Sequence, residues 1–199
     1  MGWTRVLSGL AVAGALVAQP AIAAEKQLRP FLGSTLGGST TFVDFEKASG
    51  KPHLVVGLNA AMLGDVLGVE VDFGHSPRFF QSGNNQLVLS SSVTTLTGGI
   101  VISLPRRLTE YTLRPYLVAG GGAVRSRIDH VFGVLPVSDL RAVADFGGGV
   151  TGFVTSRVGL CWDVRHFGTI GRNSGDKGVS FGAEQLSFWR ASMALAIRY

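Results

Sequence analysis

The chain of 199 residues contains a single cysteine, Cys161, so no disulfide can form within it. This excludes disulfide-stapled scaffolds and zinc sites built on several cysteines. Only 16% of the residues are charged, which is unlike a disordered chain. Beyond the first two dozen residues, no apolar run approaches the roughly 20 residues of a membrane-spanning helix. If the mature chain enters a membrane, it must do so as a closed barrel, because only helices and barrels satisfy every backbone group in lipid.

The N-terminus has the pattern of a secretory signal peptide at residues 1–23. Arg5 supplies the positive start, residues 6–18 form a weakly polar to apolar run, and residues 21–23 give the small-x-small pattern of a signal peptidase site. An uncleaved membrane anchor is the alternative, but the run is short for a bilayer. No cysteine follows the cleavage site, which argues against a lipoprotein. We expect cleavage and a mature chain of one domain, residues 24–199.

Alternation of apolar and polar residues recurs along the mature chain between turn signals, whereas helical periodicity is nearly absent. Eight strands are predicted, at residues 28–36, 54–62, 66–74, 87–104, 112–125, 142–154, 158–166 and 188–199. The connections alternate long and short, as in outer-membrane barrels with short periplasmic turns and longer extracellular loops. The predicted fold is therefore all-β, an eight-stranded antiparallel transmembrane up-and-down barrel.

The predicted strands have one apolar and one polar face. In the third, Leu67, Val69 and Val71 alternate with Gly68 and Glu70. A soluble barrel such as a lipocalin is the alternative, and it would carry many lysines and glutamates on a water-facing surface. Here the polar faces hold mainly Gly, Ser, Ala and a few Arg and Asp, which suit the narrow interior of eight strands. We therefore expect the apolar faces to contact lipid.

The fourth predicted strand is irregular. Leu87 and Leu89 are out of phase with Ile100 and Ile102. A bulge above Thr94, or a strand that rises beyond the lipid, would reconcile the two halves.

The segments "LRPYLVAGGGAVR" at 113–125 and "ADFGGGVTGFVTSRVGLCWDVRHF" at 144–167, with the closing strand, carry a likeness to a known family. Over essentially the whole mature chain, the sequence resembles the eight-stranded outer-membrane β-barrel family that includes the OmpA, OmpX and opacity-type barrels. The resemblance implies a location in the outer membrane of a Gram-negative bacterium. It also implies that the last strand carries the signal read by the barrel assembly machinery, at Met193, Leu195, Ile197 and Tyr199. Pairing of the last strand with the first would leave no open edge in the lipid.

Charged residues of the polar faces are predicted to point into the barrel. They are Glu70, Asp72, Asp145, Asp163, Arg165 and Arg190, with Arg29, Arg114 and Arg198 nearer the periplasmic end. Because such charges lose hydration, we expect a structural network of ion pairs. A gated proton or ion path is the alternative, but it needs a wet channel for which eight strands leave little room.

Histidines collect at one end of the predicted barrel. His53, His75, His130 and His166 lie at or just past the outer ends of their strands, which raises the hypothesis of a metal-binding or pH-sensing rim. Their spacing is not that of metal ligands, so no metal and no cofactor is predicted.

An enzyme is the remaining chemical alternative, because some small outer-membrane barrels modify lipid A. The sequence "GHSP" at 74–77 places His75 beside Ser76, but adjacent strand residues point to opposite faces, which is unsuited to proton transfer. We predict no catalytic residues.

The predicted function is that of a non-enzymatic outer-membrane protein, whose loops serve envelope integrity or surface interaction and adhesion. The expected partners are outer-membrane lipids and lipopolysaccharide, with a possible extracellular ligand at the loops. Four basic residues in predicted outer loops could meet phosphates or an acidic surface: Lys47, Lys51, Arg172 and Lys177. Nucleic acid is not expected, because the basic residues are scattered. A small porin-like diffusion channel is the leading alternative, and a lipid A-modifying enzyme is the third.

Overall fold

The computed structural model describes residues 24–40, 52–77, 88–105, 108–109, 113–130, 137–170 and 186–199. These residues form eight strands: β1 (Glu25–Thr40), β2 (His53–Leu63), β3 (Leu67–Pro77), β4 (Val88–Ser103), β5 (Leu113–His130), β6 (Val137–Phe153), β7 (Val158–Ile170) and β8 (Leu186–Arg198). No helix within the described ranges is long and apolar enough to cross a membrane. The predicted signal peptide and the four basic loop residues lie outside the described ranges.

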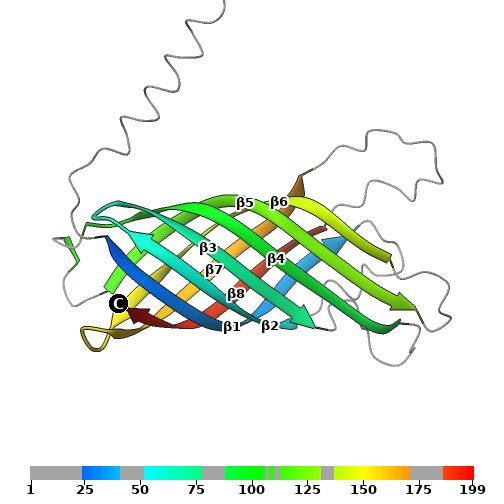
Figure 1. The fold of residues 1–199 in the computed structure, drawn as a ribbon, viewed down its shortest axis with the longest axis horizontal. Helices are drawn as coiled ribbons and strands as arrows, with labels where there is room; N and C mark the ends of the chain where they lie inside the picture. The colour runs from blue at the N-terminus through cyan, green and yellow to red at the C-terminus, as the bar shows by residue number, and fades with distance from the viewer. Residues whose placement is uncertain are drawn as a thin grey trace, which may run out of the picture.

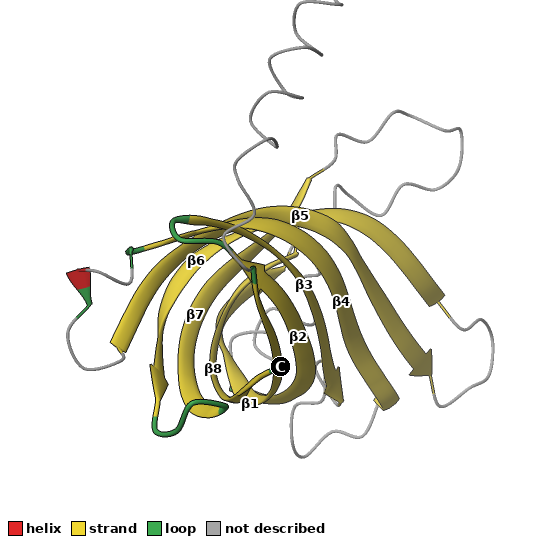
Figure 2. Cartoon of the chain, turned by 60° about the vertical axis from the view of Figure 1, so that its left-hand side comes forward, coloured by secondary structure: helices red, strands yellow, loops and turns green. Residues whose placement is uncertain are grey.

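Each strand pairs with the next in antiparallel fashion, and β8 pairs with β1 to close the barrel. Figures 1 and 2 show the strands running obliquely around a common axis. This confirms the predicted fold and the predicted pairing of the last strand with the first.

All eight predicted strands are present, but several extend further than expected. The seventh strand was predicted to end at His166, with a long loop from Phe167, and β7 in fact runs to Ile170. Similarly, β5 continues past Arg125 to His130. The backbone ladder does not require apolar side chains, so pairing continues beyond the apolar stretch.

The short connections, the start of β1 and the end of β8 lie on one side of the barrel, which we call the turn end. Gly64 N–H donates to Leu67 O at 2.8 Å between β2 and β3, and Val154 N–H donates to Val158 O at 3.0 Å between β6 and β7. Tyr199 N–H donates to Lys26 O at 3.2 Å, which ties the C-terminus to β1. We call the opposite side of the barrel the loop end.

Two register shifts interrupt the barrel, both near the loop end. One lies between Val88 and Ser90 in β4, where the sequence predicted an irregularity. The other lies between Leu36 and Ser39 in β1, where Gly37 has a φ of 58°, in the left-handed region that glycine adopts without strain. Extra residues at such points let strands of unequal length stay paired.

The two faces of the wall differ as the alternation predicted. On β3, Val69 and Val71 on the outside are 56% and 54% exposed, whereas Glu70 between them is 4% exposed. Glycines on the inner face make room for rings: a Cβ on Gly149 would lie 2.7 Å from the hydroxyl of Tyr116. The interior is therefore filled by side chains, as expected for eight strands.

Candidate functional site inside the barrel

Of the nine charged residues predicted to face inward, eight are buried inside the barrel, and Arg198 at the turn end is only half-buried. None of the eight is more than 7% exposed: Arg29, Glu70, Asp72, Arg114, Asp145, Asp163, Arg165 and Arg190. Their strands bring six of these residues together in the middle of the interior, whereas Arg29 and Arg114 lie closer to the turn end.

Asp72 on β3 and Arg190 on β8 form a bidentate ion pair across the interior. Arg190 Nη1 donates to Asp72 Oδ1 at 2.8 Å, and Nη2 donates to Oδ2 at 2.9 Å. Asn59 Nδ2 adds a longer bond to Asp72 Oδ2 at 3.4 Å. Two parallel charge-assisted bonds fix the orientation of both groups.

Arg165 on β7 joins three strands. Its Nε donates to Asp163 Oδ1 at 2.7 Å and its Nη2 donates to Asp163 Oδ2 at 3.0 Å. Its Nη1 bonds Glu70 on β3 and lies 3.8 Å from Asp145 Oδ2 on β6. One guanidinium thus holds carboxylates from opposite parts of the wall, which is the arrangement that lets buried charges offset their lost hydration.

A polar ladder continues from this centre to the turn end. The Tyr116 hydroxyl donates to Asp163 Oδ2 at 2.6 Å, and the guanidinium of Arg29 lies 5.3 Å from the centre of the Tyr116 ring. Arg29 Nε donates to Gln27 Oε1 at 2.7 Å, and Gln27 Nε2 donates to Glu25 Oε1 at 2.6 Å. We call the series Glu25, Gln27, Arg29, Tyr116 and Asp163 the polar ladder.

Arg114 has a different role at the turn end. Its Nη2 donates to the backbone oxygens of Gly64 and Asp65 at 2.7 and 2.8 Å, and its Nε donates to Leu104 O at 3.1 Å. Its Nη1 lies 3.7 Å from Glu25 Oε2. Arg114 therefore ties two short connections to the wall, outside the central network.

Among the described residues, the interior charges balance. Five carboxylates face five guanidiniums: Glu25, Glu70, Asp72, Asp145 and Asp163 against Arg29, Arg114, Arg165, Arg190 and the half-buried Arg198. The balance fits the rule that buried charges are compensated. Arg29 has no carboxylate directly beside it: within the described ranges it makes no ion pair, and its guanidinium packs on the Tyr116 ring.

An apolar layer covers the charged centre on the loop-end side. It consists of Val93, Val124, Val143, Phe167, Leu186 and Phe188, each at most 8% exposed. The Phe167 and Phe188 rings stack with centroids 5.2 Å apart, and the Arg190 guanidinium lies 4.9 Å from the Phe167 centroid. We call these six residues the loop-end seal.

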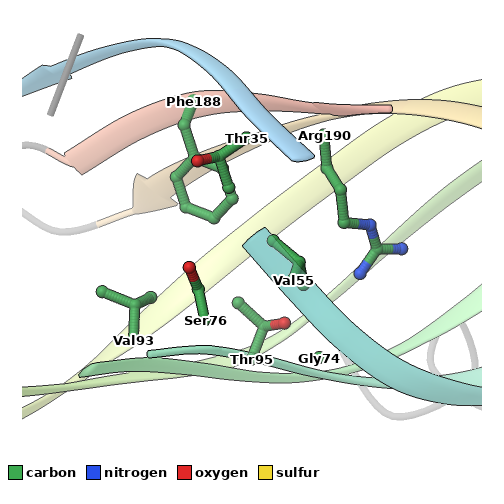
Figure 3. A pocket seen from close by; sticks show the side chains of 8 residues that line it. All are labelled: Thr35, Val55, Gly74, Ser76, Val93, Thr95, Phe188 and Arg190. Atoms are coloured by element: carbon green, nitrogen blue, oxygen red, sulfur yellow. The ribbon is translucent and has the colours of Figure 1, made fainter. Parts of the chain in front are cut away.

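One small cavity lies beneath the loop-end seal (Figure 3). Its volume is about 10 Å³, which is at the lower limit for one water molecule. In Figure 3, Arg190 on β8 lies at one side of the cavity, and Ser76 and Thr95 also line it. Gly74 keeps it open, since a Cβ there would lie 2.8 Å from Thr95 Oγ1 and 3.0 Å from Arg190 Nη1.

Of the four histidines of the hypothesised rim, the side chain of His130 lies outside the described part of the structure. His75 faces outward and its Nδ1 lies 2.9 Å from Thr94 Oγ1. His166 lies within β7, not at its end as predicted, and it packs between Phe146 and Trp189 with ring centroids 5.1 and 4.9 Å away. In the part of the chain that the structure describes, no three potential ligands cluster.

The His75 and Ser76 pair is split by the wall. Ser76 is 3% exposed on the inside, where its hydroxyl donates to Leu54 O at 2.9 Å. His75 is on the outer face, so the two side chains cannot exchange a proton.

The C-terminal strand presents its apolar residues outward. Met193 and Leu195 are 52% and 43% exposed, and Tyr199 is 74% exposed at the turn end. Ile197 is half-buried on the same face and pairs with Val158 on β7 and Leu28 on β1.

Sequence reasoning missed three members of the polar ladder. Glu25 and Gln27 precede the predicted start of the first strand, although they share the odd-numbered face of Arg29. Tyr116 has an aromatic ring and one hydroxyl, so its residue type does not show whether it faces lipid or the interior. The common parity of Glu25, Gln27 and Arg29 is the signal that could have found the first two.

Comparison with solved structures identifies the same architecture. Neisserial surface protein A matches with a TM-score of 0.58 and 13% identity, over 85% of this chain and 95% of that one. The N-terminal β-barrel domain of Pseudomonas aeruginosa OprF matches with a TM-score of 0.52 and 12% identity, over 88% and 97%. No protein-family model and no curated protein sequence matches the chain. The chain thus has the fold of the eight-stranded outer-membrane barrels that its sequence resembles.

Proposed function

We propose that the chain is a non-enzymatic outer-membrane β-barrel protein of a Gram-negative bacterium. Its loop end would face the exterior and serve surface interaction or envelope integrity, after export through a cleaved signal peptide. The single observation that carries the proposal is the polarity of the wall, in which the apolar Val69 on the outside is 56% exposed and the charged Glu70 on the inside is only 4% exposed. Apolar residues outside and charges inside are what lipid requires of a barrel.

The height of the apolar surface supports a membrane location. On β5 the outward residues run from Leu113, through Leu117 at 66% exposure, to Ala123. Ten residue steps of about 3.3 Å, inclined by about 45°, span roughly 23 Å across the membrane. This is close to the band of about 25 Å that outer-membrane barrels present to lipid.

We propose a structural role for the ion pairs of Asp72, Asp163, Arg165 and Arg190. The Asp72–Arg190 pair joins β3 to β8, and Arg165 joins β7 to Glu70 on β3, so both link strands that are not neighbours in the wall. The loop-end seal lies on one side of these pairs. A small diffusion channel is the second candidate, and the polar ladder favours it. The loop-end seal argues against a channel, because the stacked rings of Phe167 and Phe188 and four further apolar side chains occupy the interior beside Arg190.

The last strand supports recognition by the barrel assembly machinery. Met193, Leu195 and Tyr199 form an outward apolar row that ends on an aromatic ring, and β8 closes the barrel against β1. We propose that this row is the assembly signal that the resemblance implies.

The test of the proposed function is cell fractionation with electrophoresis of boiled and unboiled samples. We expect the protein in the outer-membrane fraction, with a different apparent size when unheated. Planar-bilayer recording should be silent, and stable conductance steps would favour the channel. The mass of lipid A should stay unchanged on overexpression, and an altered mass would favour the lipid A-modifying enzyme.

A further inference from the structure

Two arginines stand exposed on the outer face of β5, where the apolar surface ends. Arg125 and Arg127 are both exposed, and Val124, which precedes Arg125, is 2% exposed inside the barrel. They continue the outward row that begins at Leu113, so their side chains lie on the lipid side of the wall and not in the interior.

On the β4 side these arginines have small polar neighbours, whereas on the β6 side Arg125 pairs in register with Leu140, which is 71% exposed. Arg125 pairs in register with Thr94, and Arg127 pairs with Ser92 on β4. Thr94 is also paired with His75 on β3, whose Nδ1 lies 2.9 Å from its hydroxyl. We call His75, Ser92, Thr94, Arg125 and Arg127 the β5 patch. The β5 patch itself holds no acidic residue, and Asp129, the next position of the same row, lies outside the side chains that the structure describes.

The position of the β5 patch fits the headgroup level of a membrane. Ala123 is the last apolar residue of the outward row of β5, and Arg125 is the next residue of that row, two positions later. A guanidinium facing hydrocarbon would cost several kcal/mol, and this cost falls to about 0–1 kcal/mol at the interface. At that level the groups within reach of an arginine are lipid headgroups.

The chemistry of the β5 patch selects a phosphate. A guanidinium offers parallel N–H donors that match two oxygens of a phosphate, and hydroxyl groups beside it can donate further bonds. Arginines two residues apart on one strand lie about 7 Å from each other. This spacing lets two cations act on one doubly phosphorylated headgroup.

We infer that the β5 patch binds the phosphate groups of lipid A, the glycolipid part of lipopolysaccharide, in the outer leaflet. This inference rests on the proposed function, because it requires the barrel to lie in the outer membrane with its loop end outward. It assigns the contact to the wall of the barrel at Arg125 and Arg127, whereas the basic residues predicted from the sequence lie in the loops.

The experiment compares three proteins refolded into phosphatidylcholine vesicles with and without diphosphoryl lipid A. They are the wild type, the double variant R125Q/R127Q, and the control R157Q, which changes an exposed arginine in the β6–β7 turn at the opposite end. The midpoint of thermal unfolding is followed by the loss of the fast-migrating band in unboiled gels. We expect lipid A to raise the midpoint of the wild type and of R157Q by several degrees, and that of R125Q/R127Q by less than half as much.

Further arms separate the possible outcomes. Dephosphorylated lipid A should give no rise, and R125K/R127K, which keeps both charges, should retain part of it. An equal rise in R125Q/R127Q would overturn the inference, and so would an equal rise with inorganic phosphate alone. If R125Q/R127Q fails to fold, R125K/R127K with dephosphorylated lipid A still tests the phosphate contact, and an undiminished rise overturns it. Failure of the wild type to insert into any vesicle would overturn the proposed function as well.

Discussion

Removing the guanidinium of Arg190 should destabilise the barrel strongly. Arg190 and Asp72 are 2% and 1% exposed and share two hydrogen bonds of 2.8 and 2.9 Å. In R190L the Asp72 carboxylate loses both short charge-assisted bonds and keeps the long bond from Asn59 and the more distant Arg165, whose Nη1 lies 4.0 Å from Asp72 Oδ2. Breaking a buried ion pair from one side costs about 3–5 kcal/mol, and we expect a loss of that size in the free energy of unfolding.

The double variant D72N/R190L should recover most of this loss. It removes both charges, and replacing a buried pair with neutral groups of similar size is close to neutral or even stabilising. The control R157L changes an exposed arginine and should alter stability by no more than about 0.5 kcal/mol.

The assay is urea unfolding of the refolded protein in vesicles, followed by tryptophan fluorescence. A double-mutant cycle over Asp72 and Arg190 should give a coupling energy of about 2 kcal/mol or more. If the two single losses simply add in D72N/R190L, the two side chains do not interact, and the account of the interior given above is wrong.

Three further changes probe other parts of the interior. F188A removes one ring of the Phe167–Phe188 stack in the loop-end seal, and it should produce small conductance steps in planar bilayers where the wild type gives none. If F188A also gives no conductance, another part of the interior blocks the passage of ions. G149V should lower the free energy of unfolding by about 1–3 kcal/mol, because its Cβ would clash with the Trp162 backbone oxygen and lie 2.7 Å from the Tyr116 hydroxyl. G98A meets no atom closer than 3.8 Å and should be nearly neutral in the same urea titration. Y116F removes the bond to Asp163 and should cost about 1–3 kcal/mol; an unchanged midpoint would contradict that bond.

Alternation was enough to predict the wall. Because side chains in a strand point alternately to its two faces, Val69 and Glu70 could be assigned to opposite sides from the sequence alone. The strand count and the closing contact between the last and first strands followed from turn signals and from the need to leave no edge in lipid.

The partners inside the barrel could not be predicted in the same way. Asp72 and Arg190 are 118 positions apart, and their contact depends on the stagger of eight strands and on how far each side chain reaches across the interior. The two-residue repeat shows that a residue faces inward but not at which height it lies. The stacking of Phe167 on Phe188 could not be predicted either, because the predicted seventh strand ends at His166 and leaves Phe167 in a loop.

The most direct test of the central claim is the environment of single nitroxide labels in a C161S background, with the protein in vesicles. A label at V69C should collide more often with oxygen dissolved in the lipid than with a water-soluble nickel complex. A label at T97C, whose parent side chain is 3% exposed inside the barrel, should be shielded from both. Preferential access of the nickel complex to the label at V69C would contradict the account, since the apolar surface would then face water.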